Sequence, residues 1–383
     1  MLTLGILGGG QLGRLLCQAA LDLPVRTRVL DPAANAPAAR CCDAFVVGDF
    51  ADEATVIAFG AGCDILTIEI EHVSVAGLRA LQAAGKQVYP DPAALAIIQD
   101  KGAQKEFYRA HGLPTADFRL AESRADLHQY LDFLPAFQKL RHGGYDGHGV
   151  RALPDAAALA DAFDAPSVLE ARVHCAKELA VVCTRSVDGT IRAFPVVEMV
   201  FDARTHLVTA VAAPAEISPE LAARATRIAV RTCEAFNTVG LLAVELFLTV
   251  AGEILVNEVA PRPHNSGHHT IEANHVSQFQ QHLRAVLGLP LGDTAPRAAA
   301  AMVNLLGAPD GGDGPATVHG LADALALPGV SVHLYGKART RPHRKMGHAT
   351  VLAETVAAAQ AGAEEVARGL RIAAGYFPSY IRP

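Results

Sequence analysis

Two glutamates, Glu245 and Glu258, lie in apolar segments on either side of the dipeptide Ala251-Gly252. Residues that favour strands flank this dipeptide, so the stretch predicts a β-hairpin that turns there. A symmetric turn places the two carboxylates directly opposite each other, and nothing in the apolar flanks offsets their repulsion. Carboxylate oxygens are the ligands that Mg²⁺ prefers in proteins, and Mn²⁺ accepts them too. The hairpin therefore predicts a divalent-metal site.

A polar run punctuated by Gly and Pro, Pro261–His269, follows the hairpin. Such a run beside a metal-binding strand is typical of an active-site loop. Its three histidines would suit zinc, but the neighbouring carboxylates favour a hard cation.

A basic cluster lies near the C-terminus of this chain, whose formal net charge is −6. Six of the nine residues at 337–345 are basic: Lys337, Arg339, Arg341, His343, Arg344 and Lys345. The cluster predicts a phosphate clamp for a small anionic substrate, and a solvated loop or a localisation tag is the alternative. The negative overall charge argues against a general nucleic-acid binder.

The first glycine-rich loop, Gly8–Gly13, follows the pattern G-x-G-x-x-G between a predicted strand and a predicted helix. Asp31, at the end of the next predicted strand, completes the dinucleotide-binding fingerprint. Backbone N–H groups at a helix N-terminus suit any phosphate. The loop therefore fits a nicotinamide cofactor, a substrate phosphate or a structural turn, and the nucleotide-binding features further along the chain favour the last two.

The second glycine-rich loop, Gly143–Gly149, follows a short apolar stretch that contains Lys139. It lacks the G-x-x-x-x-G-K-[ST] pattern of a P-loop. The loop predicts a flap that folds over phosphates, and a plain hairpin loop is the alternative. Further on, Val168–Val173 and Lys177–Val182 predict two strands whose linker can read an adenine edge, with Glu178 placed to accept hydrogen bonds from ribose hydroxyls.

The elements that position these residues alternate between strand and helix in the N-terminal part, which predicts a parallel sheet. Strands are expected at residues 2–7, 28–30, 44–47 and 64–68, and helices near 12–20, 52–59 and 74–84. Pro90 and Pro92 end this part. Pro290 begins a linker to a last part with strands expected near 299–305, 331–335 and 348–352 and a helix at 354–372.

The composition is that of a folded, multi-domain chain. With 383 residues, of which 51% are hydrophobic and 19% charged, two or three domains are expected. No apolar run reaches the ~18–20 residues that cross a membrane, so we expect no membrane partner. The first residues predict a strand, so we expect no signal peptide. Its seven cysteines form no CxxC pair, so we expect reduced, buried cysteines in a cytoplasmic protein.

These motifs, in this order, resemble the ATP-grasp superfamily and, within it, the 5-(carboxyamino)imidazole ribonucleotide synthases of purine biosynthesis. The similarity covers nearly the whole chain, and it is carried by six strings: Gly5–Arg14, Glu69–Val73, Gly143–Gly147, Asn257–His268, His333–Lys337 and Arg344–His348. The Glu-His-Val and Asn-Ser-Gly-His strings are far more specific for this family than either glycine-rich loop.

The resemblance implies an α/β fold with a Rossmann-like preATP-grasp domain over residues 1–97, an ATP-grasp domain over 98–290 and a small β-rich C-terminal domain over 291–383. It implies a homodimer that uses ATP and Mg²⁺ to join hydrogencarbonate to the amine of aminoimidazole ribonucleotide. ATP would phosphorylate hydrogencarbonate, and the amine would attack the resulting carboxyphosphate or CO₂ released from it. Glu71 or Asp146 would orient or deprotonate the amine.

The resemblance also implies roles for individual residues. ATP would contact Lys101, Lys139, Gly143, Gly144, Tyr145, Asp146, Gly147, His148, Gly149, Glu170, Ala171, Arg172, Val173, Glu178, Asn257 and Glu258. Mg²⁺ would bind Glu245 and Glu258. The substrates would contact Gly9, Gly10, Gln11, Leu12, Asn265, Arg344 and Lys345. The catalytic set would be Glu71, Tyr145, Asp146, Arg262, His264 and Lys337.

Two positions depart from the family pattern. His148 stands where the family usually has Arg or Lys, and it carries a positive charge only when protonated. Phe201 stands where the family often has His, and it could at most stack on the base. Both departures concern the affinity for ATP and not the reaction.

Three other functions fit parts of the sequence. A related ATP-grasp ligase would use formate in place of hydrogencarbonate. A nicotinamide dehydrogenase would need no ATP. A nucleotide sensor would bind ATP without turnover, but the pair Glu245 and Glu258 argues against this.

Overall fold

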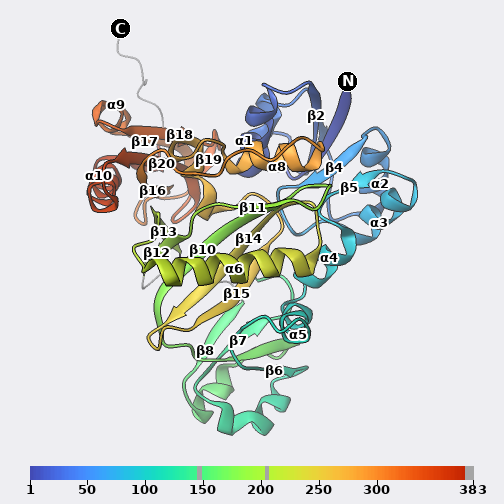
Figure 1. Ribbon diagram of the computed structural model, residues 1–383, viewed down its shortest axis with the longest axis vertical. Helices are drawn as coiled ribbons and strands as arrows, with labels where there is room; N and C mark the ends of the chain where they lie inside the picture. Colours follow the sequence, from blue (N-terminus) through green and yellow to red (C-terminus); the bar gives the residue numbers. More distant parts are fainter. Residues whose placement is uncertain (145–148, 203–206, 376–383) are drawn as a thin grey trace.

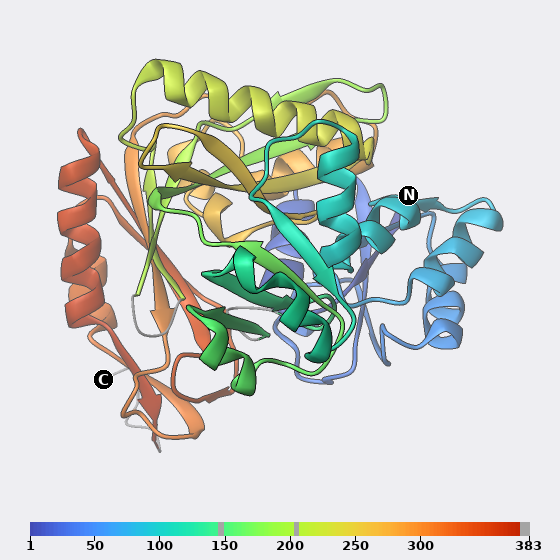
Figure 2. The ribbon, with the colours of Figure 1, turned by 90° about the horizontal axis from the view of Figure 1, so that it is seen from below.

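The computed structural model describes residues 1–144, 149–202 and 207–375. Tyr145, Asp146, Gly147 and His148, for which sequence analysis predicts roles, lie outside these ranges. Figure 1 follows the described chain from a blue N-terminal sheet, through a green and yellow central region, to red C-terminal elements. Seen from below in Figure 2, the N-terminal elements and the C-terminal helix lie on opposite sides of the central region.

The N-terminal part is a parallel five-stranded sheet with the order β3-β2-β1-β4-β5. Its strands are β1 (Leu2–Leu7), β2 (Val25–Asp31), β3 (Ala44–Val47), β4 (Ile65–Ile68) and β5 (Gln87–Val88), and its helices are α1 (Gln11–Ala20), the short η1 (Pro37–Arg40), α2 (Glu53–Ala61) and α3 (Val75–Ala83). Asp52 and Ser74 begin α2 and α3 by accepting hydrogen bonds from backbone N–H groups of the first turn. The predicted alternation of strands and helices is confirmed.

A small antiparallel sheet with the order β6-β9-β7-β8 follows two helices. The elements are α4 (Pro92–Ile98), α5 (Lys101–Ala110), β6 (Phe118–Ala121), η2 (Ala125–Phe133), β7 (Ala136–Leu140), β8 (Val150–Leu153), η3 (Ala156–Asp161) and β9 (Ser167–Ala171). Asp100 caps α5 and also accepts hydrogen bonds from Arg141, which follows β7. The cap joins the helix to the sheet and places Lys101 and Lys105 beside β7 and β9.

The largest sheet has the order β15-β14-β10-β12-β13-β16-β20-β18, with β11 beside β10. Its central elements are β10 (Cys175–Arg185), β11 (Ile191–Ala193), β12 (Val197–Phe201), β13 (Val208–Ala213), α6 (Pro219–Phe236), β14 (Gly240–Thr249), β15 (Ile254–Ala260), η4 (Asn265–Gly267), α7 (Thr270–Ala273) and α8 (Gln278–Val286). Because β13 pairs with β16, one sheet runs across residue 290 from the central region into the C-terminal part.

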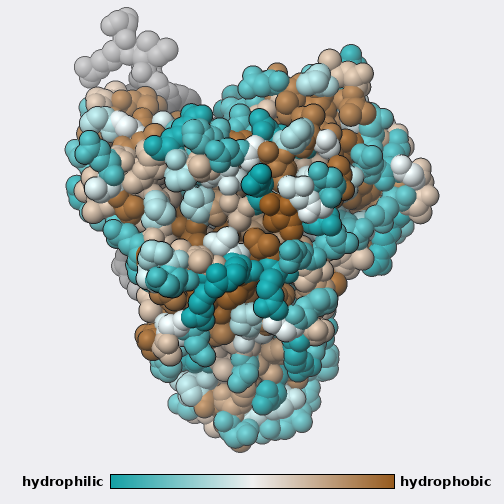
Figure 3. Space-filling view, in the orientation of Figure 1, coloured by the Kyte–Doolittle hydropathy of each residue, from teal (hydrophilic) through white to brown (hydrophobic). Residues whose placement is uncertain are grey.

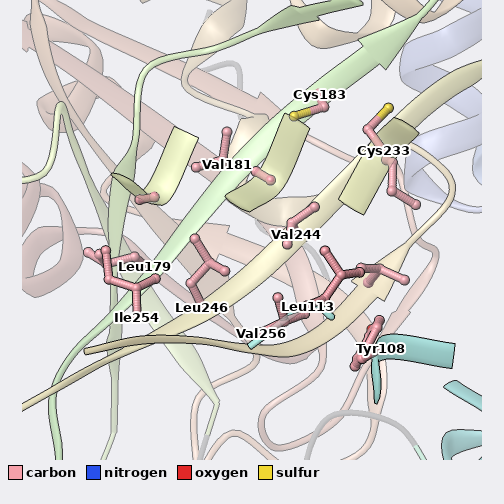
Figure 4. Close-up of a cluster of buried hydrophobic side chains, with 14 of the residues drawn as sticks. Tyr108, Leu113, Leu179, Val181, Cys183, Cys233, Val244, Leu246, Ile254 and Val256 are labelled. Carbon is pink, nitrogen blue, oxygen red and sulfur yellow. The ribbon is translucent and has the colours of Figure 1, made fainter. Parts of the chain in front are cut away.

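The core of the central region lies between this sheet and α6. Figure 4 shows Leu179 and Val181 of β10 beside Val244 and Leu246 of β14, with Cys233 of α6 facing them. Burial of these apolar side chains holds the helix on the sheet. The opposite face of α6 is exposed, and Figure 3 shows hydrophilic residues gathered over it across the middle of the molecule. The core therefore fixes β10, β14 and β15 as a rigid platform.

The C-terminal part adds three strands to the large sheet and a second small sheet with the order β19-β17-β21. Its elements are β16 (Ala299–Leu306), β17 (Gly314–His319), α9 (Leu321–Ala326), β18 (Val330–Leu334), β19 (Arg339–Thr340), β20 (Lys345–Ala353), α10 (Val356–Gly369) and β21 (Arg371–Ala374). The helix predicted up to residue 372 ends at Gly369. The reason is that β21 pairs with β17 and buries Ile372 in the core of this part.

The cysteine prediction is confirmed only in part. All seven cysteines are free, but only Cys17, Cys63, Cys183 and Cys233 are buried. Cys175 is exposed, so its thiol is not a core group. A membrane-crossing helix, long and apolar enough for a bilayer, is not found in the described ranges.

Candidate active site

The carboxylates of the β14–β15 hairpin lie close together, although not in the predicted register. Val244 pairs with Val259, but Leu246 pairs with Val256, so a β-bulge shifts the register between them. Glu245 consequently faces both Asn257 and Glu258 instead of Glu258 alone. The hairpin itself is confirmed, and the expectation of direct opposition is wrong because the bulge adds one residue to β15.

Lys101, at the start of α5, neutralises Glu258. Its Nζ atom lies 2.5 Å from Oε2 of Glu258, from a position 157 residues away in the sequence. The charge of Lys101 lowers the pKa of Glu258 to about 2, although burial opposes this shift. The expectation of uncompensated repulsion at the hairpin is therefore wrong. It considered only the apolar flanks, whereas the compensating cation comes from α5.

A second set of charges lies next to this pair and is more deeply buried. Glu170 accepts from Lys105 at 2.5 Å and pairs with Lys139 at 2.5 Å, and Lys139 also donates to Asn257 at 3.1 Å. Burial disfavours the Glu170 carboxylate, but the charges of Lys139 and Lys105 outweigh it and lower the pKa to about 2. The side chain of Glu170 therefore positions Lys139 toward the hairpin.

Sequence reasoning missed Lys105, whose side chain is only 4% exposed. Burial lowers its pKa to about 8, although Glu170 counteracts this. Lys105 follows Lys101 by one helical turn, so both lie on the same face of α5. That spacing is the signal that could have found it.

Glu178 joins the acidic side of the site. It pairs with Phe247 across β10 and β14, while Ala180 pairs with Glu245, so Glu178 and Glu245 lie on the same face of the sheet. Burial, followed by the charge of Glu245, raises the pKa of Glu178 to about 7. Ionised Glu178 would be repelled by the carboxylates of Glu245 and Glu258. A divalent cation bound among them would offset this repulsion.

The donor set fits Mg²⁺ bound together with phosphates. Within residues 1–144, 149–202 and 207–375, no group of three or more His, Cys, Asp or Glu side chains is arranged to hold a metal ion. Mg²⁺ at nucleotide sites is usually held by one or two carboxylates, with phosphate oxygens and water completing the shell. Glu245 and Glu258 can supply that share.

A third group of residues brings the N-terminal part to the hairpin. Arg262, just after β15, pairs with Glu71 from the loop after β4 at 2.7 Å. His264 places Nε2 3.2 Å from Oε1 of Glu245, and its Nδ1 lies 2.9 Å from the hydroxyl of Ser266. Three residues that were predicted to be catalytic, Glu71, Arg262 and His264, therefore lie close to the β14–β15 hairpin.

The Gly8–Gly13 loop already holds an anion from its own chain. The carboxylate of Glu69 accepts hydrogen bonds from the N–H groups of Gly10, Leu12 and Gly13 at 2.9–3.1 Å. Burial raises the pKa of Glu69, whereas these hydrogen bonds counteract the shift. A Cβ atom at Gly10 would lie 2.7 Å from this carboxylate, so the glycine makes room for it.

This arrangement supports the structural turn, which is one of the two interpretations that the sequence favoured for the loop. Asp31 accepts from the N–H of Gly9 at 2.7 Å, so it serves the loop and not a ribose. The N–H groups of Gly9, Gly10 and Leu12 are likewise committed within the chain and are not available as phosphate donors. Sequence reasoning missed Glu69, whose only signal was its position next to Glu71 at the end of a buried strand.

Comparison with known proteins matches each part of the chain. Residues 1–99 match the family "Ribonucleotide synthetase preATP-grasp domain", 106–279 match "ATP-grasp domain", and 300–362 match "Phosphoribosylaminoimidazole carboxylase C-terminal domain". N5-carboxyaminoimidazole ribonucleotide synthase of Mycobacterium tuberculosis is 40% identical over 92% of this chain and 84% of its own length. The chain belongs to the N5-carboxyaminoimidazole ribonucleotide synthase family.

Solved structures of this family have the same fold. The Thermotoga maritima synthetase has a TM-score of 0.89 and 40% identity, covering 98% of this chain and 100% of that one. The Aspergillus clavatus synthase in complex with ADP and 5-aminoimidazole ribonucleotide has a TM-score of 0.85 and 32% identity, covering 95% and 97%. The chain spans only 64% of the length of the chloroplastic phosphoribosylaminoimidazole carboxylase of Vigna aconitifolia, which is 40% identical.

The basic cluster expected to bind phosphate in this family is only partly brought together. Arg339, Arg341 and Arg344 line a pocket of about 260 Å³ with Asp313 and Thr340. Burial, with the charge of Arg341 next, lowers the pKa of Arg344. Outside the pocket lining, Lys337 donates to the carbonyl of Lys345 at 2.8 Å. His343 has a left-handed backbone with φ of 63°, which turns the chain between β19 and β20.

Most of the remaining residues that the family resemblance assigns to the nucleotide lie around the small sheet formed by β6, β9, β7 and β8. Gly143, Gly144 and Gly149 flank the undescribed part of the flap, and Leu140 donates to the carbonyl of Gly149. The N–H groups of Ala171, the last residue of β9, and Arg172, the first residue after it, donate to the carbonyls of Asp117 and Pro135. Adenine could therefore be read only by other groups of these two residues and by Val173. Phe201, at the end of β12, packs against a separate hydrophobic cluster.

Proposed function

We propose that this chain carboxylates the amine of 5-aminoimidazole ribonucleotide with hydrogencarbonate, using ATP and producing the N5-carboxyamino product, ADP and phosphate. One observation carries the proposal most strongly: the lysine–glutamate site on the hairpin adjoins the Glu71–Arg262 pair through His264, which contacts Glu245 at 3.2 Å. A phosphoryl donor and an anionic acceptor bound at these two places would meet. The Aspergillus clavatus synthase, which is 32% identical to this chain, binds ADP and 5-aminoimidazole ribonucleotide together in its crystal structure.

On the nucleotide side, Glu245 and Glu258 would hold Mg²⁺, or Mn²⁺ in its place. The cation would neutralise charge on the phosphates during transfer. Lys101 would leave Glu258, 2.5 Å away, and turn to phosphate. Lys139, held by the buried Glu170, would contact the same phosphates from β7. Lys139 would need little reorganisation to stabilise the transferring group, because Glu170 already holds it in place, whereas Lys101 would first have to turn away from Glu258.

On the acceptor side, Arg262, His264 and Asn265 would hold hydrogencarbonate. An oxygen of hydrogencarbonate attacks the γ-phosphorus, the bond to ADP breaks, and carboxyphosphate forms. The exocyclic amine then forms the new bond to the carboxyl carbon, directly or through CO₂, while phosphate leaves. The amine loses a proton in this step, and Glu71, paired with Arg262 at 2.7 Å, is placed to orient the amine or accept the proton.

The ribonucleotide phosphate would bind the basic cluster. Arg339, Arg341 and Arg344 supply guanidinium groups that match phosphate oxygens, whereas Lys337 and Lys345 lie outside this pocket lining. We further propose that the chain works as a cytoplasmic homodimer, as its family resemblance implies. Light scattering after gel filtration tests the dimer, and fractionation of the source cells tests the location.

Phosphate release from ATP tests the proposed reaction. We expect release to require both hydrogencarbonate and 5-aminoimidazole ribonucleotide, and ¹³C NMR to show carbon from labelled hydrogencarbonate in the product. Equal turnover with formate and glycinamide ribonucleotide would overturn the proposal, as would ATP hydrolysis indifferent to the ribonucleotide. Omission of divalent metal, with EDTA present, should stop the reaction.

A further inference from the structure

Gln278, the first residue of α8, lies behind the proposed acceptor site. Its side chain is fully buried, at 0% exposure. Its Oε1 accepts from the N–H of His264 at 2.9 Å, its Nε2 donates to the carbonyl of His264 at 2.7 Å, and the same Nε2 lies 3.0 Å from Nδ1 of His268. The amide therefore holds both backbone groups of one residue, as a neighbouring strand would.

The surrounding chain closes tightly on this amide. A Cβ atom at Gly267 would lie 2.5 Å from Oε1 of Gln278, so the loop can pass this close only as glycine. The N–H of Gln278 donates to the hydroxyl of Thr270 at 2.8 Å, and that hydroxyl donates to the carbonyl of Gly267 at 2.5 Å. The loop and the start of α8 thus form one hydrogen-bonded unit.

The imidazole of His264 lies toward the proposed reaction site. Its imidazole lies 3.2 Å from Glu245, while its backbone is tied to Gln278. We propose that Gln278 is a positioning residue: it fixes the backbone of His264 so that the imidazole stays against Glu245, next to the proposed hydrogencarbonate site. This inference rests on the proposed function, because His264 has its acceptor-side role only there.

The same helix contains a matched control. Gln281 is also fully buried, and its amide makes the same pair of hydrogen bonds, accepting from the N–H of Gly292 at 2.8 Å and donating to its carbonyl at 3.1 Å. Gly292 belongs to the segment after α8 and to none of the proposed binding groups. Gln281→Met therefore removes an equivalent buried contact away from His264.

The experiment compares Gln278→Met with Gln281→Met in the full chain. We expect thermal stability to fall in both variants and somewhat more in Gln278→Met, because Met keeps the length of the side chain while Gln278→Met loses three hydrogen bonds and Gln281→Met loses two. Only Gln278→Met should lower kcat, by about tenfold or more, since small misplacements of reacting groups are costly. Its KM for ATP should stay within about threefold of wild type, because the nucleotide contacts lie on other elements. Equal kcat in the two variants would overturn the proposal.

A second measurement needs no turnover. In protein labelled with ¹³C at histidine Cε1, the resonance of His264, assigned by its loss in His264→Asn, should shift or broaden in Gln278→Met and stay in place in Gln281→Met. An unmoved resonance overturns the positioning role. If the wild-type protein is inactive but the His264 resonance still shifts in Gln278→Met, the proposed function is refuted and the positioning role is not. If Gln278→Met does not fold, Gln278→Glu and Gln281→Glu take their places, because each keeps the acceptor and loses the donor.

Discussion

The Gly8–Gly13 loop and the β14–β15 hairpin both carry a sequence pattern that indicates a ligand, and both are neutralised from within the chain. In the loop, buried Glu69 satisfies three backbone N–H groups. In the hairpin, Glu258 is half-buried and its partner Lys101 is 23% exposed. The first contact is enclosed, whereas the second can open to solvent. Burial thus decides whether an internal partner is permanent or gives way to a ligand.

Loss of the hairpin carboxylate should have the largest effect. Glu258→Gln is expected to reduce phosphoryl transfer by about 10³-fold or more, because the metal loses a charged ligand. Stability should fall by no more than about 1 kcal/mol, since Lys101 can turn to water. Phosphate release tests the effect on phosphoryl transfer, and thermal melts test the effect on stability. Glu253→Gln, at the exposed turn of the same hairpin, is the control, and near-normal turnover of Glu258→Gln would show that the metal binds elsewhere.

Loss of the enclosed carboxylate should act on stability. Glu69→Ala leaves three N–H groups at the start of α1 without their acceptor, and each costs about 1–3 kcal/mol when buried. We expect about 3–5 kcal/mol lower free energy of unfolding in denaturant titrations. Glu53→Ala, at an exposed position of α2, should cost less than about 1 kcal/mol. An unchanged Glu69→Ala protein would mean that water replaces the carboxylate and that the loop is open to ligands.

The basic cluster provides an intermediate case, since its pocket is open to an external anion. Arg344→Ala should raise KM for the ribonucleotide about 10- to 100-fold, the loss expected for a charged hydrogen bond to phosphate. KM for ATP should not change. Arg371→Ala, whose side chain pairs with Asp310 on the surface of the same part, should leave both constants as they are. The opposite pattern, a raised KM for ATP alone, would assign the cluster to the nucleotide.

The smallest effect concerns Glu178, whose pKa is raised to about 7. The folded state holds this proton more tightly than the unfolded state, so the residue's contribution to stability falls as the pH rises from about 4.5 to 7. Glu178→Gln should therefore match wild type near pH 4.5 and become more stable by about 1 kcal/mol near pH 8, after allowance for solvent screening. Thermal melts without metal test this. A constant difference across this range would show that Glu178 does not titrate there.

Much of the site follows from local sequence. The hairpin at Ala251-Gly252 and the parallel sheet of the N-terminal part are both found where predicted. Alternation of apolar residues and turn-forming pairs acts over a few positions, so these elements need no knowledge of distant neighbours. The strings around Glu71 and His264 also sufficed to identify the family.

Tertiary structure decided which charges meet. Lys101 reaches Glu258 across 157 positions, Lys105 reaches Glu170 across 65, and Glu69 reaches Gly10 across 59. The bulge that sets both Asn257 and Glu258 opposite Glu245 was likewise absent from the prediction, which assumed a regular hairpin. Strand periodicity specifies which residues face one side of a sheet, but the partner of a buried charge depends on which elements the fold brings beside it. That is the reason why the sequence alone predicted a carboxylate pair and a glycine-rich loop, and only the folded chain showed that each already has a partner.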